Sequence, residues 1–105
     1  MTHGALVNDI LVALSPFGHV WKNNSGAVKV GQQFIRYGQV GSADILGCIG
    51  GRFVGIEVKV GRDRLSAKQS AWAASVVRAG GLWCEARSVD DALDLVSAIA
   101  PRGDA

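Results

Sequence analysis

The stretch DILGCIGGRFVGIEVKVGR, residues 44–62, decides the fold of this chain. Two apolar segments flank the pair Gly50-Gly51. A two-residue turn between antiparallel strands needs residues with positive φ, so this stretch predicts a β-hairpin. The stretch also places three charged residues in or beside these segments: Asp44, Glu57 and Lys59. Burying a charge is costly unless it is paired or bound to a metal. These residues are therefore either surface positions of no consequence or parts of a site.

The register of this hairpin brings two acidic side chains together. With the turn at Gly50-Gly51, paired residue numbers sum to 101, so Asp44 falls opposite Glu57. Side chains alternate along a strand, which puts Lys59 on the face of Glu57 and the even-numbered residues 54–60 in the core. Like charges directly opposite are destabilising, and a cation between them would relieve the repulsion. The alternative is two solvent-facing carboxylates with Lys59 as a salt-bridge partner, and the geometry favours neither.

The remaining patterns predict a single mixed α/β domain over residues 1–105, with 100–105 as a frayed tail. Ser66 and Gln69 have the spacing of a capping box, which predicts a helix start. The expected elements are a helix over 4–15, strands over 19–23, 27–30, 33–38, 42–49 and 52–60, a helix from 66 to 79, a strand over 82–87 and a helix over 89–99. The order α-β-β-β-β-β-α-β-α predicts a mixed central sheet flanked by helices.

Composition restricts the class of protein. Hydrophobic residues make up 49% of the 105, which supports a core and argues against disorder. Cys48 and Cys84 lie in apolar segments and are interpreted as buried free thiols. His3 and His19 are isolated, so no structural zinc site is expected. Without a secretory signal or an apolar run long enough to span a bilayer, a cytoplasmic protein is expected.

Positive charge is concentrated after the second strand of the hairpin. The whole chain has a net charge of +2, but residues 59–68 alone contain four basic residues and one acidic residue. Such a local patch suits a phosphate backbone. The alternative is a solvated loop and helix start, and charge alone favours that alternative.

These motifs together resemble the PD-(D/E)XK nucleases. The residues that carry the resemblance are SAD (42–44), EVK (57–59) and GRDRLSAKQSAW (61–72). More narrowly, the chain resembles the small stand-alone VRR-NUC nucleases of phage and bacterial genomes, over most of its length and including WKNNSGA (21–27). The segment VGRDRLS departs from the local sequence after which that family is named. The resemblance implies a restriction-endonuclease-like core.

The resemblance implies roles for particular residues. Asp44 and Glu57 would be metal ligands, with the Val58 backbone carbonyl as a third, and Mg²⁺ is the implied cofactor, with Mn²⁺ as a substitute. Lys59 would orient the attacking water, and Gln69 would lie beside the site as well as cap its helix. An acidic residue on the first helix often assists the metal in this family. Asp9 is the nearest candidate, and a solvated helix residue is the alternative.

Basic and aromatic residues outside this set have simpler interpretations. The candidates for contacts with the DNA backbone are Arg62, Arg64, Lys68, Lys22, Asn24, Lys29 and Arg36. For each one taken singly, an ordinary exposed residue is the alternative. Trp72, Trp21 and Trp83 are interpreted as core residues rather than as platforms for base stacking.

The implied activity is a Mg²⁺-dependent DNA endonuclease specific for branched DNA such as four-way junctions. Since one chain of this size holds one active site, and related family members resemble dimeric junction resolvases, a homodimer is expected. No membrane association and no nucleotide cofactor are expected, and the expected location is the cytoplasm of a bacterial or phage-infected cell. The alternatives are a sequence-specific endonuclease of restriction type and a non-catalytic nucleic-acid-binding module on the same fold.

Overall fold

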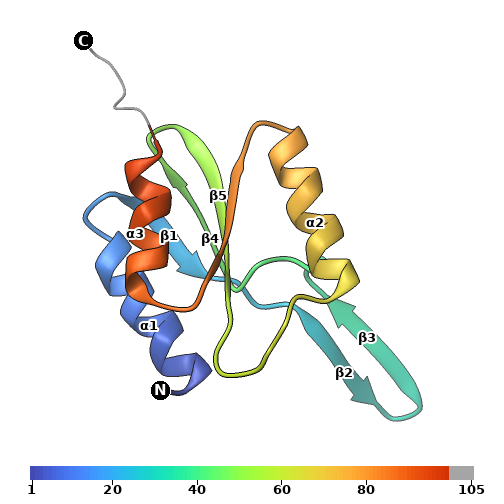
Figure 1. Cartoon of the computed structure of the whole chain (residues 1–105). Coiled ribbons are helices and arrows are strands. Elements are labelled where there is room, and N and C mark those ends of the chain that lie inside the picture. Colours follow the sequence, from blue (N-terminus) through green and yellow to red (C-terminus); the bar gives the residue numbers. More distant parts are fainter. Residues whose placement is uncertain (100–105) are drawn as a thin grey trace.

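The computed structural model describes residues 1–99 and has the predicted order of elements (Figure 1). The helices are α1 (His3–Leu14), α2 (Ala67–Arg78) and α3 (Val89–Ser97). The strands are β1 (Gly18–Lys22), β2 (Gly26–Val30), β3 (Gln33–Tyr37), β4 (Ile45–Ile49), β5 (Arg52–Val58) and β6 (Leu82–Ala86). The expectation for 100–105 lies outside the described residues. The predicted mixed α/β fold with its flanking helices is confirmed.

A four-stranded mixed sheet in the order β1-β4-β5-β6 forms the centre of the fold. β5 and β6 run parallel, and the other two pairs are antiparallel. Ile45 pairs with Ile56 and Ile49 pairs with Arg52, so the predicted sum of 101 holds. Gly50 and Gly51 have φ of +59° and +80°, values that side chains rarely adopt. The Gly-Gly turn therefore fixes the register as the sequence predicts.

The hydrophobic core lies between this sheet and the pair α1 and α3. The even-numbered β5 residues Val54, Ile56 and Val58 are fully buried, which confirms the predicted core face. One side of α1 packs against them through the buried residues Leu6, Val7, Ile10 and Leu14. The spacing of these residues follows the helical period, so α1 turns a single apolar stripe toward the sheet.

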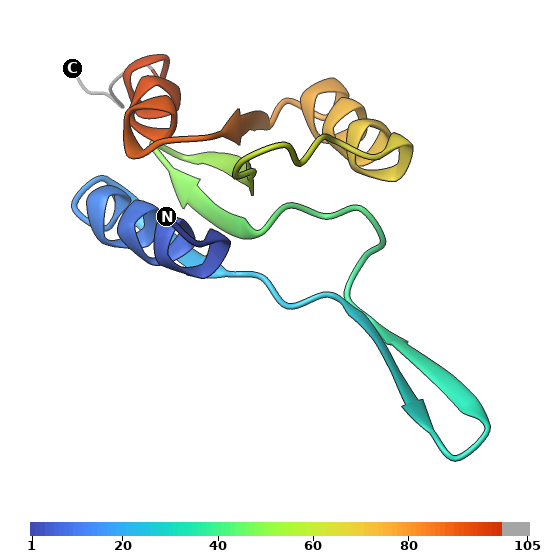
Figure 2. The same ribbon diagram turned by 60° about the horizontal axis from the view of Figure 1, so that its bottom comes forward.

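The helix α2 lies on the opposite face of the sheet and covers only part of it (Figure 2). Trp72 packs on Gly55 of β5, where a Cβ would come within 2.9 Å of the indole ring. Farther from α2, the same face of β1 and β4 is open, and Trp21 and Cys48 are exposed. The prediction that these two are core residues is wrong, because apolar neighbours in sequence do not reveal which strands a helix covers.

The helices begin at hydrogen-bonded caps. Ser66 and Gln69 form the predicted capping box at the start of α2, and the Ser88 hydroxyl caps α3 by accepting a hydrogen bond from the Asp91 N–H. Each cap satisfies backbone donors that have no partner inside the helix. Among residues 1–99, no helix has the length and apolar character needed to cross a membrane.

Strands β2 and β3 form a separate two-stranded sheet that projects from the domain (Figures 1 and 2). All ten of its strand residues are exposed. Its turn contains Gly31, which has φ of +63°, as the predicted hairpin around Gly31-Gln32 requires. The Lys29 ammonium lies 6.0 Å from the centre of the Phe34 ring on the strand opposite. We call this projecting hairpin the arm.

Gly55→Ala should destabilise the fold, because the added methyl group meets the Trp72 ring through which α2 packs on β5. We expect a loss of about 1–3 kcal/mol, the usual effect of overpacking, in urea unfolding. Gly4→Ala is the matched control, since a Cβ at Gly4 meets nothing within 4 Å and Ala favours the helix. Equal stabilities for the two variants would contradict this packing account.

Candidate active site

Glu57 is a buried carboxylate near the carboxyl end of β5. Its residue is only 3% exposed, so the alternative of two solvent-facing carboxylates does not describe it. The Lys59 ammonium lies 3.4 Å from Glu57 Oε2, and the Gln69 side-chain amide donates a hydrogen bond of 3.1 Å to the same oxygen. Lys59 is itself buried, at 9% exposure. The sheet thus holds a carboxyl group and an amino group close together in a largely dry position beside α2.

Gln69 has both of the roles that its position in the sequence suggested. Its Oε1 accepts a hydrogen bond of 2.9 Å from the Ser66 N–H, which completes the capping box. Its Nε2 simultaneously donates to Glu57. Because the cap fixes the oxygen end of the amide, the nitrogen end is held toward the carboxylate. The start of α2 therefore positions Glu57.

Asp44 reaches the site in a different way from the one predicted. The β4–β5 ladder ends at the pair Ile45 and Ile56, one residue short of the expected pair between Asp44 and Glu57. The Asp44 carboxylate turns instead to accept a hydrogen bond of 2.8 Å from the Val58 N–H. The side-chain oxygen of Asp44 thus takes the place of the backbone oxygen that would have accepted the Val58 N–H if the ladder continued. The carboxylate remains beside Glu57 at the open end of the two strands.

The two carboxylates influence each other. Burial is the main cause that raises the pKa of Glu57 from its ordinary value of 4.5 to about 7, and the neighbouring Asp44 charge raises it further, while Lys59 opposes the shift. Two acidic groups that share a site cannot both ionise freely. Glu57 therefore holds a proton up to near-neutral pH.

His3, which the sequence presented as isolated, belongs to the site. Its Nε2 lies 3.2 Å from Asp44 Oδ2 and 3.1 Å from the Val58 carbonyl oxygen. Only the packing of α1 on the sheet shows this, because His3 is 41 and 55 residues away from these partners in sequence. Asp9, the predicted acidic residue of this helix, is exposed, and none of the described hydrogen bonds or ion pairs connects it to the site.

Arg87 is a second residue that the sequence did not single out. Its guanidinium donates to the carbonyl of Gly61 at 3.0 Å and to that of Asp63, and its Nε is 2.8 Å from Glu85 Oε2. Gly61 and Asp63 belong to the loop that leaves β5. Because β6 runs parallel to β5, a residue that follows β6 lies at the same edge of the sheet as this loop. Arg87 thereby anchors the backbone next to Arg62.

The predicted DNA contacts are all exposed and lie in two groups. Arg62 and Arg64 lie in the loop after β5, and Lys68 lies in the first turn of α2. The second group lies at the end of β1, in the segment between β1 and β2, and along the arm: Lys22, Asn24, Lys29 and Arg36. None of these side chains takes part in an ion pair within residues 1–99. Both groups therefore offer free donors for a phosphate backbone.

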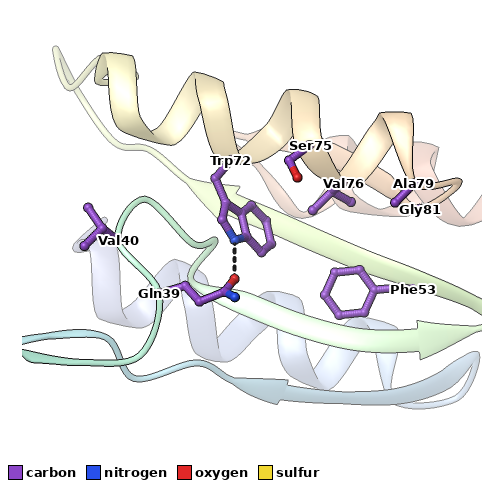
Figure 3. Close-up of a pocket in the computed structure, with 8 residues that line it drawn as sticks. All are labelled: Gln39, Val40, Phe53, Trp72, Ser75, Val76, Ala79 and Gly81. Atoms are coloured by element: carbon purple, nitrogen blue, oxygen red, sulfur yellow. Dashed lines mark hydrogen bonds between the residues drawn. The ribbon is translucent and has the colours of Figure 1, made fainter.

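A hollow of about 510 Å³ lies beside α2 (Figure 3). Trp72 forms one wall, and its Nε1 donates a hydrogen bond of 2.8 Å to Gln39 Oε1. Phe53 and Val76 form the apolar side of the hollow. Trp72 is thus half-buried at a rim rather than in the core as predicted, and it lies one helical turn beyond Gln69. The hollow adjoins the Glu57 site without containing its charged groups.

Side chains alone do not form a metal site of three or more ligands here. Within residues 1–99, no group of three His, Cys, Asp or Glu side chains is placed to hold an ion. A cation at this position would therefore depend on backbone carbonyl oxygen and water as well as on side chains.

No protein-family model matches the chain, and no curated protein is significantly similar to it. The function is accordingly inferred from the chemistry of the site.

The stability of the metal-free protein should decrease as the pH rises, because of Glu57. The pKa of this carboxyl is about 7 in the fold, against an ordinary 4.5, so the folded state binds the extra proton between these values. The contribution of Glu57 to stability is then greatest below about pH 4.5 and is lost as the pH rises through about 7, by on the order of 3 kcal/mol in total. Glu57→Gln should remove this decline in urea unfolding with EDTA.

Asp90→Asn is the control for this measurement, since Asp90 is an exposed carboxylate on α3. Its pH dependence should follow that of the wild type. A Glu57→Gln protein whose stability still falls in parallel with the wild type would show that Glu57 is not the titrating group.

Proposed function

We propose that this chain is a Mg²⁺-dependent DNA endonuclease with a PD-(D/E)XK-type site, similar to the stand-alone VRR-NUC nucleases. The observation that carries the proposal is the convergence of Asp44, Glu57 and Lys59 where β4 begins and β5 ends. The buried Glu57 and Lys59 have no need to exist beside the partly buried carboxylate of Asp44 for stability alone, since such groups are costly to desolvate. Phosphodiester hydrolysis makes use of each of them.

The donor atoms at the site fit a hard divalent cation. The candidate ligands are the carboxylates of Asp44 and Glu57 and the carbonyl oxygen of Val58, all oxygen donors of the kind that Mg²⁺ prefers. The Val58 carbonyl lies close to the Asp44 carboxylate, since one nitrogen of His3 is within hydrogen-bond distance of both. When bound, Mg²⁺ would supply Lewis acidity toward the phosphate and acidify a water molecule. We expect Mn²⁺ to substitute.

Lys59 and Gln69 complete the site around this acidic pair. The Lys59 ammonium has three donors, of which Glu57 engages one, so the others can hold a water or a phosphate oxygen. Its burial strengthens its interaction with the negative charge that develops on the phosphate. Gln69 keeps Glu57 Oε2 turned toward α2 through a second hydrogen bond. The products of attack by water at phosphorus would carry 5′-phosphate ends.

Two basic regions would position the DNA. Arg87 fixes the loop of Arg62 and Arg64, and residues 22–43, which include the arm, contain three basic residues and no acidic one. Contacts of this kind bind phosphates without reading sequence. We therefore favour recognition of DNA structure, with branched DNA such as four-way junctions as the substrate. A sequence-specific restriction-type enzyme would need more base-reading loops than this short chain provides.

A second copy of the chain would be needed to cut two strands symmetrically. Each chain has a single Asp44–Glu57 pair, so a homodimer supplies the two sites that a junction or duplex requires. We place this activity in the cytoplasm of a bacterial or phage-infected cell, with no nucleotide cofactor. A non-catalytic DNA-binding module is the outcome to be distinguished, because it would retain DNA binding without cleavage.

Lys59→Ala should slow cleavage strongly while leaving DNA binding largely unchanged. Wild-type protein with Mg²⁺ is expected to cut branched DNA, in preference to linear duplex and single strands. The variant should be slower by roughly 10²- to 10³-fold, because it lacks the buried ammonium. Binding is measured separately by fluorescence anisotropy in EDTA. Arg78→Ala, at the far end of α2, is the control for loss of a basic residue and should cut normally.

Two results would contradict the proposal in different ways. Wild-type protein that binds branched DNA but cuts nothing with Mg²⁺ or Mn²⁺ would be a binding module. Lys59→Ala protein that cuts as fast as the wild type would show that the active site lies elsewhere.

The double variant Arg62→Ala/Arg64→Ala should weaken binding to every DNA substrate to a similar degree. Both guanidinium groups are expected to contact phosphates, so the slope of log K against log salt should become shallower by roughly 2. Arg78→Ala again provides the control and should keep the wild-type slope. A loss of affinity confined to one sequence, or an unchanged slope, would show that the loop does not contact the backbone.

A further inference from the structure

We infer that His3 Nε2 is a ligand of the divalent cation, together with Asp44 Oδ2 and the Val58 carbonyl oxygen, and that the site therefore binds Mn²⁺ and Co²⁺ more tightly than Mg²⁺. This inference rests on the proposed function for the presence of a cation. It goes further by naming a third kind of donor and the metal preference that follows. The acidic pair alone implies only a site for hard ions.

The spacing of the three donor atoms fits a shared ion. His3 Nε2 is 3.2 Å from Asp44 Oδ2 and 3.1 Å from the Val58 carbonyl oxygen. Two donors at right angles around an octahedral ion, with bonds of about 2.1 Å, lie about 3 Å apart. The imidazole therefore needs little movement to bind the same ion as the two oxygens. His3 would thus add one imidazole nitrogen to the carboxylate and carbonyl oxygens of the proposed site.

Hydrogen bonds alone do not account well for the close approach of His3 Nε2 to two oxygen atoms. Asp44 Oδ2 and the Val58 carbonyl are both acceptors, whereas Nε2 of a histidine carries at most one hydrogen. That hydrogen would have to be divided between two oxygens. The Asp44 oxygen already accepts the Val58 N–H at 2.8 Å, so it does not depend on His3 to be satisfied. A cation could use the lone pairs of all three atoms at once.

The fold of α1 presents His3 to the site. Thr2 caps the helix by accepting a hydrogen bond of 3.1 Å from the Ala5 N–H, so His3 is the first residue of the helix. Leu6 and Val7, three and four positions later, lie on the buried face that packs on the sheet. His3 continues this face beyond the edge of the core, above the end of β5. Its side chain is 44% exposed, which leaves room for water and for exchange of the ion.

An imidazole donor changes which metals bind well. Nitrogen ligands favour the later first-row ions, and affinity rises from Mn²⁺ to Co²⁺, whereas carboxylate and carbonyl oxygens alone suit Mg²⁺. Removing His3 should thus reduce the affinity for Mn²⁺ and Co²⁺ more than that for Mg²⁺. Replacing it by Asp should shift the preference back toward Mg²⁺.

Isothermal titration calorimetry on metal-free protein with Mg²⁺, Mn²⁺ or Co²⁺ tests this inference without any DNA. We expect the wild type to bind Mn²⁺ and Co²⁺ at least about tenfold more tightly than Mg²⁺. His3→Ala should lower the affinities for Mn²⁺ and Co²⁺ by roughly tenfold or more and that for Mg²⁺ by much less. His3→Asp should restore binding with a preference for Mg²⁺. His19→Ala, which removes the exposed histidine of β1, should change none of the affinities.

Paramagnetic Co²⁺ provides a direct readout, because the ring protons of a liganded His3 should show large shifts in the NMR spectrum and those of His19 should not. Unchanged Mn²⁺ and Co²⁺ affinities in His3→Ala protein, together with loss of binding in Asp44→Asn protein, would overturn the role of His3 and leave the proposed nuclease site standing. No binding of any of the three ions to the wild type would overturn both.

Discussion

The burial of Glu57 is the constraint on which the arrangement of this protein depends. A carboxylate that is 3% exposed is stable only where its surroundings compensate for lost water. Lys59 and Gln69 supply part of this compensation, and a proton supplies the rest, since the pKa of Glu57 is raised to about 7. The negative charge of Asp44 makes the ionised form of Glu57 less favourable and so raises the pKa of Glu57. In the proposed function, a divalent cation would take the place of the proton on Glu57.

Three separate parts of the fold meet at this site. The Gly50-Gly51 turn sets the β4–β5 register, which brings Asp44 to the Val58 N–H. The capping box at the start of α2 holds Gln69 against the carboxylate. The first turn of α1 adds His3 from the other side of the sheet. Because elements distant in sequence all contribute, the site depends on the complete fold rather than on the hairpin alone.

Local signals in the sequence predicted the fold well, and longer-range contacts explain what they missed. The order of elements followed from the Gly-Gly turn and from caps such as Ser66, which act within a few residues. The exposure of Trp21 and Cys48 depended on which strands α2 covers, and no local pattern carries that information. β4 begins at Ile45 rather than at 42, because the Asp44 side chain replaces a backbone partner.

The difference between local signals and longer-range contacts also applies to the site. The register of the hairpin predicted that Asp44 and Glu57 lie close together, whereas the place of Gln69 beside them was implied by the resemblance to VRR-NUC nucleases. His3 and Arg87 reach the site only through the packing of α1 on the sheet and through the parallel pairing of β6 with β5. Parallel pairing and helix docking join residues far apart in sequence, and a single sequence gives no direct sign of either.

A crystal structure of the protein soaked in Mn²⁺ tests the central claim, that Asp44 and Glu57 together hold a divalent cation. The account predicts an anomalous difference peak at the end of β5, within about 2.2 Å of carboxylate oxygens of both residues and of the Val58 carbonyl. In that structure Glu57 would have exchanged its proton for the ion. No peak there at saturating Mn²⁺, with the Glu57 carboxylate still bound only by Lys59 and Gln69, would contradict the account.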